Sequence, residues 1–266
     1  MKETHVIAVA NQKGGVGKTT TAINLSAALA ERGKRVLLID LDPQGNASTG
    51  LGILPSQRNY TTYDLLLDST PIGDIVKKSA FPGIWVCAAN SDLASADIEI
   101  SASSRRSFLM RDALSRAEFG AFGFDFVLID CPPSLSILTI NAMVAADSVL
   151  LPLQSEFFAL EGLSQLLLTI REVRKSANPS LRIEGVLLTM HDVRNRLSQQ
   201  VENDARDTLG EVVFSTVIPR NVRVSEAPSF AQPVLNYDSQ SKGAQAYRSL
   251  ADELLARKAA SRDTKV

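Results

Sequence analysis

Short apolar stretches of strand length alternate along this sequence with longer segments in which apolar residues recur every three or four positions. The stretches are continuously apolar, which is typical of strands buried on both faces of a parallel sheet. They cover residues 5–10, 35–41, 84–89, 124–130, 148–153, 183–190 and 212–218. The helical periodicity covers residues 19–32, 103–117, 138–145, 162–175, 198–209 and 243–258. Because strands that alternate with helices form right-handed crossovers, we expect an α/β fold whose mostly parallel sheet has helices on both faces.

The alternation continues without an internal repeat or a linker, so we expect a single domain over residues 1–258. Residues 259–266 are mostly polar or small, and we expect them to form a frayed tail. A chain of 266 residues is long enough to bury a full core without disulfides or metals. Its two cysteines, Cys87 and Cys131, are isolated, which argues against a disulfide framework and against a metal site made by one chain.

The charges of the chain are nearly balanced. There are 28 Lys and Arg residues against 29 Asp and Glu residues, a formal net charge of −1. This balance excludes binding to nucleic acid through overall basicity, so any such binding needs a local patch. No apolar run reaches the roughly 20 residues that span a bilayer, and the first residues lack the apolar core of a signal peptide. We expect a cytoplasmic protein that does not bind a membrane.

The strongest chemical signal is the glycine-rich segment KGGVGKTT between the first predicted strand and the first predicted helix. Glycines allow backbone N–H groups to cradle phosphate oxygens, and the helix N-terminus adds its dipole. Lys18 supplies a cation to the β- and γ-phosphates, the Thr19 hydroxyl can bind Mg²⁺, and Thr20 can donate to phosphate. The predicted phosphate-binding residues are Lys13, Gly14, Gly15, Val16, Gly17, Lys18, Thr19 and Thr20. Gln12 occupies the position of the ordinary first glycine, and Lys13 is an additional lysine.

Three aspartates follow or end two of the predicted strands: Asp40, Asp42 and Asp130. Ligands of open α/β sheets bind beyond the carboxyl ends of the strands, where these side chains are expected. A carboxylate beside a P-loop can hold Mg²⁺ directly or through water, or can orient an attacking water molecule. Strand-end aspartates also commonly cap turns, and for Asp40 the two interpretations are equally good.

The segment with its extra lysine resembles the deviant Walker A motif of the ParA/MinD/nitrogenase-iron-protein ATPases, which are P-loop NTPases. The resemblance continues through LLIDLDPQGNAS, LIDCPPS, EFFALEGL and IPRNVRVSEAPS, and it is most similar to the ParA/Soj branch. It implies a Mg²⁺-dependent ATPase that forms a sandwich homodimer with ATP, in which Lys13 reaches the partner's phosphates. It also implies non-specific, nucleoid-associated DNA binding by that dimer, and hydrolysis stimulated by a ParB-type centromere-binding protein, in chromosome or plasmid partition.

The resemblance also implies roles for individual residues. The expected catalytic residues are Lys13, Lys18 and Asp42, with Asp42 positioning the attacking water. The residues expected at the metal are Thr19, Asp40 as a supporting acid, and Asp130 through a water ligand. The residues expected near the base are Met190, Pro219 and Asn221. The residues expected to contact DNA are Arg194, Arg196, Arg223 and Lys242.

DNA binding follows from the resemblance and not from the composition. Between His191 and Phe230 there are five basic and six acidic residues, so this window is not basic. Two alternatives therefore stay open. The first is a related ATPase that positions a protein or membrane cargo without binding DNA. The second is a P-loop kinase that acts on a small molecule, although the sequence offers no lid or substrate pocket for one. The absence of an Asn-Lys-x-Asp motif favours ATP over GTP.

Overall fold

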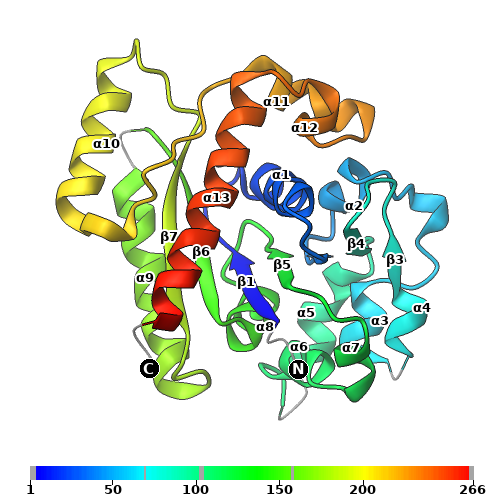
Figure 1. Ribbon diagram of the computed structural model, residues 1–266. Coiled ribbons are helices and arrows are strands. Elements are labelled where there is room, and N and C mark those ends of the chain that lie inside the picture. Colours follow the sequence, from blue (N-terminus) through cyan, green and yellow to red (C-terminus); the bar gives the residue numbers. More distant parts are fainter. Residues whose placement is uncertain (1–3, 69, 102–104, 157–158, 264–266) are drawn as a thin grey trace.

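A seven-stranded sheet lies at the centre of the molecule, in the order β3-β4-β2-β5-β1-β6-β7 (Figure 1). The computed structural model describes residues 4–68, 70–101, 105–156 and 159–263. The strands are β1 (His5–Val9), β2 (Val36–Asp40), β3 (Val76–Lys78), β4 (Ile84–Cys87), β5 (Phe126–Asp130), β6 (Ser148–Gln154) and β7 (Arg182–Thr189). All neighbouring strands are parallel except β3, which pairs antiparallel with β4 at one edge. The predicted mostly parallel sheet is confirmed, and β3 is an edge strand that the pattern did not predict.

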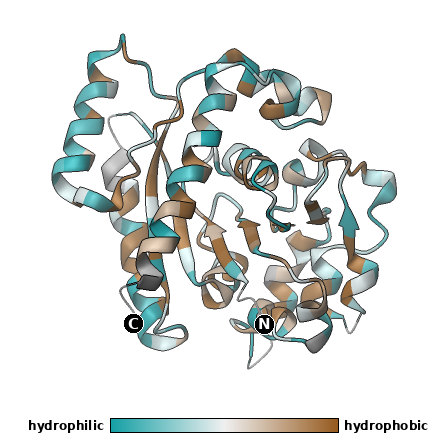
Figure 2. Cartoon of the chain, in the orientation of Figure 1, coloured by the Kyte–Doolittle hydropathy of each residue, from teal (hydrophilic) through white to brown (hydrophobic). Residues whose placement is uncertain are grey.

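Helices cover both faces of the sheet. Alternate residues of one strand point to opposite faces, so in β1 Ile7 and Val9 belong to one core cluster and Ala8 to the other. The face of Ile7 is covered by α1 (Lys18–Glu31), α12 (Val234–Tyr237) and α13 (Lys242–Asp263). The opposite face is covered chiefly by α3 (Thr62–Leu67), α5 (Leu93–Ser101), α6 (Leu109–Leu114), α8 (Ile137–Ala145) and α9 (Ala159–Ser176). Figure 2 shows brown, hydrophobic residues along the strands and teal along the outlying helix α10 (Arg196–Leu209).

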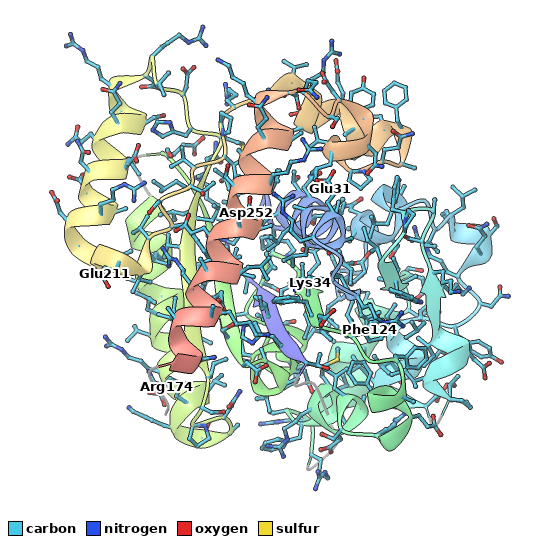
Figure 3. All side chains as sticks on the ribbon, viewed as in Figure 1. Glu31, Lys34, Phe124, Arg174, Glu211 and Asp252 are labelled. Atoms are coloured by element: carbon cyan, nitrogen blue, oxygen red, sulfur yellow. The ribbon has the colours of Figure 1, made fainter. Side chains whose placement is uncertain are left out.

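The helix after the phosphate-loop segment is held against the last helix by ion pairs as well as by apolar contacts. Arg32 lies 2.7 Å from Asp252, and Arg248 lies 2.7 Å from Glu31. Figure 3 shows Glu31 on α1 and Asp252 on α13 at this junction. The two ends of the chain therefore form one structural unit around α1.

The single helix predicted over residues 103–117 is wrong. The chain forms α5, α6 and the short α7 (Ala117–Ala121), and residues 102–104 lie outside the described part. Asn141 of α8 explains the interruption, because its side chain accepts from the Met110 N–H at 3.3 Å and donates to the Arg106 carbonyl at 2.7 Å. These bonds hold a turn before α6 that apolar periodicity does not reveal.

The strand predicted over residues 212–218 is also wrong. The 3-10 turn η2 (Gly210–Val212) is followed by backbone that forms no regular ladder with β7: there is an isolated bridge between Val213 and Val186, and the Ile218 N–H donates to the Leu188 carbonyl at 2.8 Å. The N–H groups of Ser215 and Thr216 donate to the carboxylate of Glu253 on α13, at 2.8 and 2.9 Å. A side chain distant in sequence therefore takes the donors that a regular strand would give to its neighbour.

Several short helices lack the length to produce a periodic signal. They are α2 (Asn46–Gly50), α4 (Ile72–Ile75), α11 (Val222–Glu226), the 3-10 turns η1 (Pro55–Gln57) and η3 (Ala227–Phe230), and the helices α3, α7 and α12 named above. The last helix, α13, continues through residues 259–263, which the sequence assigns to the polar tail. None of the described helices combines the length and the apolar character that crossing a bilayer requires.

Candidate functional site

The segment between β1 and α1 forms a loop that only glycine permits. Gly15 and Gly17 have φ angles of 75° and 86°, in the left-handed region that residues with a Cβ avoid. Gly17 is also the N-cap of α1, and no side chain caps that helix end. The first N–H groups of α1 are consequently available to an anion, which is the environment that a phosphate needs.

Lys18 lies inside this loop. Its side chain is buried, and its ammonium donates to the carbonyl of Lys13 at 3.0 Å. Burial lowers the pKa of Lys18, and the negative charges of Asp130 and Asp42 oppose that shift. The Thr189 hydroxyl on β7 donates to the Val16 carbonyl at 2.8 Å and ties the loop to the end of that strand. The loop is thus closed around the Lys18 ammonium.

The second lysine of the loop has the opposite environment. The backbone carbonyl of Lys13 faces Lys18, whereas its side chain is exposed at the rim. Its ammonium lies 2.7 Å from the carboxylate of Glu156, just after β6. The structure therefore does not bring the Lys13 ammonium into the interior of its own loop.

Asp40 and Asp130 end the neighbouring strands β2 and β5 and are direct partners in the sheet register. Asp130 is completely buried, and neither of its carboxylate oxygens has a hydrogen-bond partner among the described residues. Burial raises the pKa of Asp130 well above its ordinary range and the charge of Asp40 adds to this, whereas the nearby Thr19 hydroxyl and the charge of Lys18 oppose it. A buried carboxylate without partners beside a phosphate loop fits a hydrated divalent cation, whose charge and water ligands would satisfy it.

Asp40 is buried equally but has different partners. Its Oδ2 accepts from the Ser48 N–H at 2.8 Å and from the Ser48 hydroxyl at 2.6 Å, and its Oδ1 accepts from the Asp42 N–H at 3.2 Å. Burial raises the pKa of Asp40 to about 6, although the bonds from Ser48 oppose this. Because both carboxylate oxygens of Asp40 accept hydrogen bonds from the segment that follows β2, Asp40 fits the role of a supporting acid near the metal and not that of a direct metal ligand.

Asp42 lies in the turn between β2 and α2. Its Oδ1 accepts from the Gln44 N–H at 3.0 Å, and its carbonyl accepts from the Gly45 N–H at 2.9 Å. The side chain is partly exposed, and its charge acts on Lys18, Asp40 and Asp130, so the four groups lie close together. The arrangement collects a phosphate loop, a buried carboxylate pair and a partly exposed carboxylate at one edge of the sheet.

The residues expected near a base lie beyond the end of β7. His191 and Pro219 form a backbone bridge, which brings Met190 close to the segment of Pro219 and Asn221. Met190 has a φ of 50°, a conformation that a non-glycine side chain rarely adopts and that often marks a binding site. The Asn221 side chain caps α11 by accepting from the Arg223 N–H at 2.9 Å.

Two of the arginines expected to contact DNA are already paired. Arg194, whose side chain is 86% exposed, lies 3.0 Å from Asp192. Arg223, at 53%, lies 2.9 Å from Glu226 and 3.3 Å from Asp238. Arg196 and Lys242 are exposed at the first residues of α10 and α13. These residues form two separate groups, one between β7 and α10 and one where α11 meets α13.

Among the described residues, several that contact this site are absent from the predicted set, including Thr189, Ser48, Arg58 and Glu156. Ser48 and Glu156 belong to the quoted segments LLIDLDPQGNAS and EFFALEGL, which is a signal that could have pointed to them. Arg58 belongs to no motif, and its contacts with Gly45 and Thr49 and its interaction with the charge of Asp40 connect it to the site.

Comparison with known proteins decides the family. A family model described as an AAA domain matches residues 4–183. The chromosome partitioning protein ParA of Caulobacter vibrioides is 58% identical over 252 residues, which cover 95% of this chain and 94% of that protein. The sporulation initiation inhibitor protein Soj of Bacillus subtilis is 50% identical and covers 94% of this chain and 98% of its own. This chain belongs to the ParA/Soj family. As a ParA/Soj chromosome-partitioning ATPase, it hydrolyses ATP.

Solved structures agree with this membership. A Mycobacterium smegmatis protein named cobyrinic acid a,c-diamide synthase, with a bound ATP analogue and magnesium, has a TM-score of 0.82 at 39% identity and covers 95% of each chain. The cell division ATPase MinD of Pyrococcus furiosus has a TM-score of 0.77 at 26% identity, with 96% of this chain and 99% of that chain covered. The ParA/Soj chain therefore has the P-loop ATPase fold, and the ATP analogue and magnesium bound in the first of these structures agree with ATP and Mg²⁺ as its cofactors.

Proposed function

We propose that this ParA/Soj protein is an ATP-dependent switch that partitions DNA. ATP joins two copies in a sandwich dimer, the dimer binds DNA non-specifically on the nucleoid, and hydrolysis releases it. A ParB-type centromere-binding protein stimulates hydrolysis and so drives segregation of a chromosome or plasmid in the cytoplasm, without a membrane. The observation that carries the proposal is that the two loop lysines lie in different environments. The Lys18 ammonium lies inside the loop, whereas the Lys13 ammonium lies outside it.

Lys18 serves the phosphates of its own loop, because its ammonium lies inside that loop. The Lys13 side chain is then available to a nucleotide in a second copy, and the exposed rim leaves it room to move. A contact that exists only between two nucleotide-loaded copies favours the dimer by its differential binding energy. Lys13 therefore couples the γ-phosphate to association.

The remaining residues have separate roles in binding the metal, the phosphates, the attacking water and the base. Bound Mg²⁺ would neutralise charge on the phosphates, held by the Thr19 hydroxyl and, through water, by Asp130, with Asp40 as the supporting acid. The backbone N–H groups of residues 14–20 hold the phosphate oxygens, and Thr20 donates to one of them. Asp42 orients the attacking water, and the two lysines stabilise the charge that develops. Met190, Pro219 and Asn221 surround the base.

DNA binding rests on Arg194, Arg196, Arg223 and Lys242. All four are exposed, so phosphates can reach them, and a dimer doubles the small number of cations that one copy presents. The pairs of Arg194 with Asp192 and of Arg223 with Glu226 are exposed and weak, so DNA phosphates can replace the carboxylates. This exchange makes DNA binding sensitive to salt.

The test is DNA affinity with ADP and with a non-hydrolysable ATP analogue, at two salt concentrations, with duplexes of unrelated sequence. We expect tight binding only with the analogue, equal for all sequences and weaker at the higher salt concentration. Light scattering in parallel reports the dimer. Equal affinity with both nucleotides, or preference for one sequence, would contradict the proposal.

One observation favours a second function, an ATPase that positions a protein or membrane cargo without binding DNA. Carboxylates already neutralise Arg194 and Arg223 in this structure. The same experiment separates the two functions. An ATP-dependent dimer with active hydrolysis and no DNA affinity at low salt would favour the second.

A further inference from the structure

One arginine outside every motif binds the backbone on which Asp42 lies. Arg58 follows η1, and its guanidinium donates to the carbonyls of Ile53, Ala89 and Gly45 and to the Thr49 hydroxyl. The shortest of these bonds, from Nη2 to the Thr49 oxygen, is 2.7 Å, and the bond from Nη1 to the Ala89 carbonyl is 2.9 Å. Nη2 lies 2.9 Å from the Ile53 carbonyl and 3.3 Å from that of Gly45. These acceptors come from α2, from the residues on either side of it, and from the segment that follows β4.

Gly45 is in direct contact with this guanidinium. Its φ is 63°, and a Cβ at this position would lie 2.2 Å from Nη1 of Arg58 and 2.9 Å from the Ala89 carbonyl oxygen. The absence of a side chain is therefore what allows the guanidinium to lie flat on the turn. The Gly45 N–H in turn donates to the Asp42 carbonyl, so Arg58 holds the far end of the turn that carries Asp42.

The same turn is anchored from its other side. Ser48 donates to Asp40, and its hydroxyl accepts from the Ala89 N–H at 3.0 Å. Both backbone groups of Ala89 are thus hydrogen-bonded: its N–H donates to the Ser48 hydroxyl, and its carbonyl accepts from Arg58. Within the described part of the chain, the hydrogen bonds of Arg58 go to Gly45, to Thr49 of α2, to Ile53 and to Ala89, and none goes to the phosphate loop at residues 13–20.

We propose that Arg58 is a positioning residue for ATP hydrolysis, which clamps the Asp42–Gly45 turn so that the Asp42 carboxylate is held where the water must attack. The inference rests on the role proposed above for Asp42. Only a guanidinium has the fixed, planar set of donors that reaches three carbonyls and a hydroxyl at once. A lysine ammonium at this position satisfies part of the set and leaves the turn loose.

The test measures single-turnover hydrolysis of radiolabelled ATP and the affinity for a fluorescent ATP analogue in R58A, R58K, D42A and the R58A/D42A double variant. We expect R58A and R58K to hydrolyse about 10- to 100-fold more slowly, since a misplacement near 1 Å has that effect. Their nucleotide affinity should stay within about twofold, because the phosphate loop is untouched. In the D42A background R58A should cause no further loss.

Arg35→Ala is the matched control. Arg35 also binds backbone, donating to the Phe122 carbonyl at 2.8 Å, and its guanidinium lies 4.4 Å from the Trp85 ring centroid. It lies just before β2, at the opposite end from Asp40, so its loss should lower Tm without slowing hydrolysis. If R58A does not fold, the same measurements are made on R58K, which retains the charge and the approximate length of the side chain.

Wild-type hydrolysis in R58A or R58K would overturn the inference and leave the Asp42 assignment intact. So would an equal loss of rate and affinity, the same slowing in R35A, or a full additional loss in the double variant. Wild-type hydrolysis in D42A is a different failure. It would remove the proposed role of Asp42 and, with it, the inference that depends on that role.

Discussion

The ammonium of Lys13 lies 2.7 Å from the carboxylate of Glu156, at the exposed rim of the phosphate loop. The two side chains are 44% and 49% exposed, so water and salt weaken their attraction. In the dimer proposed above, a phosphate on a second copy would therefore replace Glu156 at a small cost in free energy. In this structure, the pair holds the second loop lysine against its own chain.

Removing the charge of Glu156 should favour dimer formation. In Glu156→Gln the concentration of non-hydrolysable ATP analogue that gives half-maximal dimer should fall, by up to about fivefold, which corresponds to an exposed ion pair of about 1 kcal/mol. Analytical ultracentrifugation measures this. Glu172→Gln is the control, because it removes a comparable pair with Lys175, at 3.1 Å on α9. Identical dimerisation of wild type and Glu156→Gln would mean that Glu156 does not compete for Lys13.

Substitutions of the two loop lysines should affect different properties, nucleotide binding for Lys18 and dimerisation for Lys13. Lys18→Ala removes the buried cation of the loop, so binding of a fluorescent ATP analogue should fall by about 100-fold or more, the scale of a lost charged hydrogen-bond partner. Lys13→Ala should bind nucleotide nearly as the wild type does and yet remain a monomer with ATP. If Lys13→Ala loses nucleotide affinity as fully as Lys18→Ala, Lys13 serves its own loop and the proposed dimer contact is wrong.

Asp42→Ala should separate binding from turnover. The phosphate loop and the buried aspartates remain, so the variant should bind ATP and form the dimer, while steady-state phosphate release falls by about 100-fold or more, typical of losing a water-positioning group. Asp68→Ala is a control for removing an acidic residue elsewhere, at the end of α3. Normal phosphate release by Asp42→Ala would assign the water to another residue.

Arg223→Ala should weaken DNA binding and leave ATP-driven dimerisation unchanged. The dimer loses one phosphate contact per copy, so the slope of log affinity against log salt should become shallower by about 2. Arg174→Ala, an exposed arginine near the end of α9, is the matched control and should change neither property. A parallel loss of dimer and DNA affinity would place Arg223 in the fold or the nucleotide site.

The stability of the fold should depend on pH through His5, remote from the nucleotide site. His5 lies 2.8 Å from Glu184 and 3.4 Å from Asp147. Burial and the charge of Lys258 lower the pKa of His5, but bonds to both carboxylates outweigh them and raise it above 6.5. Protonated His5 therefore stabilises the folded state below its unfolded pKa, and this contribution disappears as pH rises through the folded pKa.

Thermal unfolding at several pH values between 6 and 9 checks this prediction. Wild-type Tm should fall with rising pH more than that of His5→Gln, which keeps a donor but cannot titrate. The lowered pKa values of Asp147 and Glu184 add a second loss, at acidic pH, as these carboxylates become protonated. Parallel Tm curves for wild type and variant between pH 6 and 9 would show that His5 is not the titrating group.

The local features of this protein were readable from its sequence. Continuous apolar runs identified the six parallel strands, because a strand buried on both faces has no polar position to offer. The glycines at positions 15 and 17 identified the loop, since their left-handed φ angles require glycine. The same pattern wrongly predicted a strand at residues 212–218, because the N–H groups of Ser215 and Thr216 donate to Glu253 of α13 instead of to a neighbouring strand.

By itself, then, the sequence determined the six parallel strands, the phosphate loop and the strand ends at which Asp40 and Asp130 lie. Only the tertiary structure decided how those residues are used. Two aspartates with the same local pattern differ because Ser48 engages Asp40, while the oxygens of Asp130 have no hydrogen-bond partner within the described chain. Lys13 meets Glu156 across 143 positions, and Arg58 meets Ala89 across 31. Such contacts arise from the packing of distant segments, which no local pattern of residues encodes.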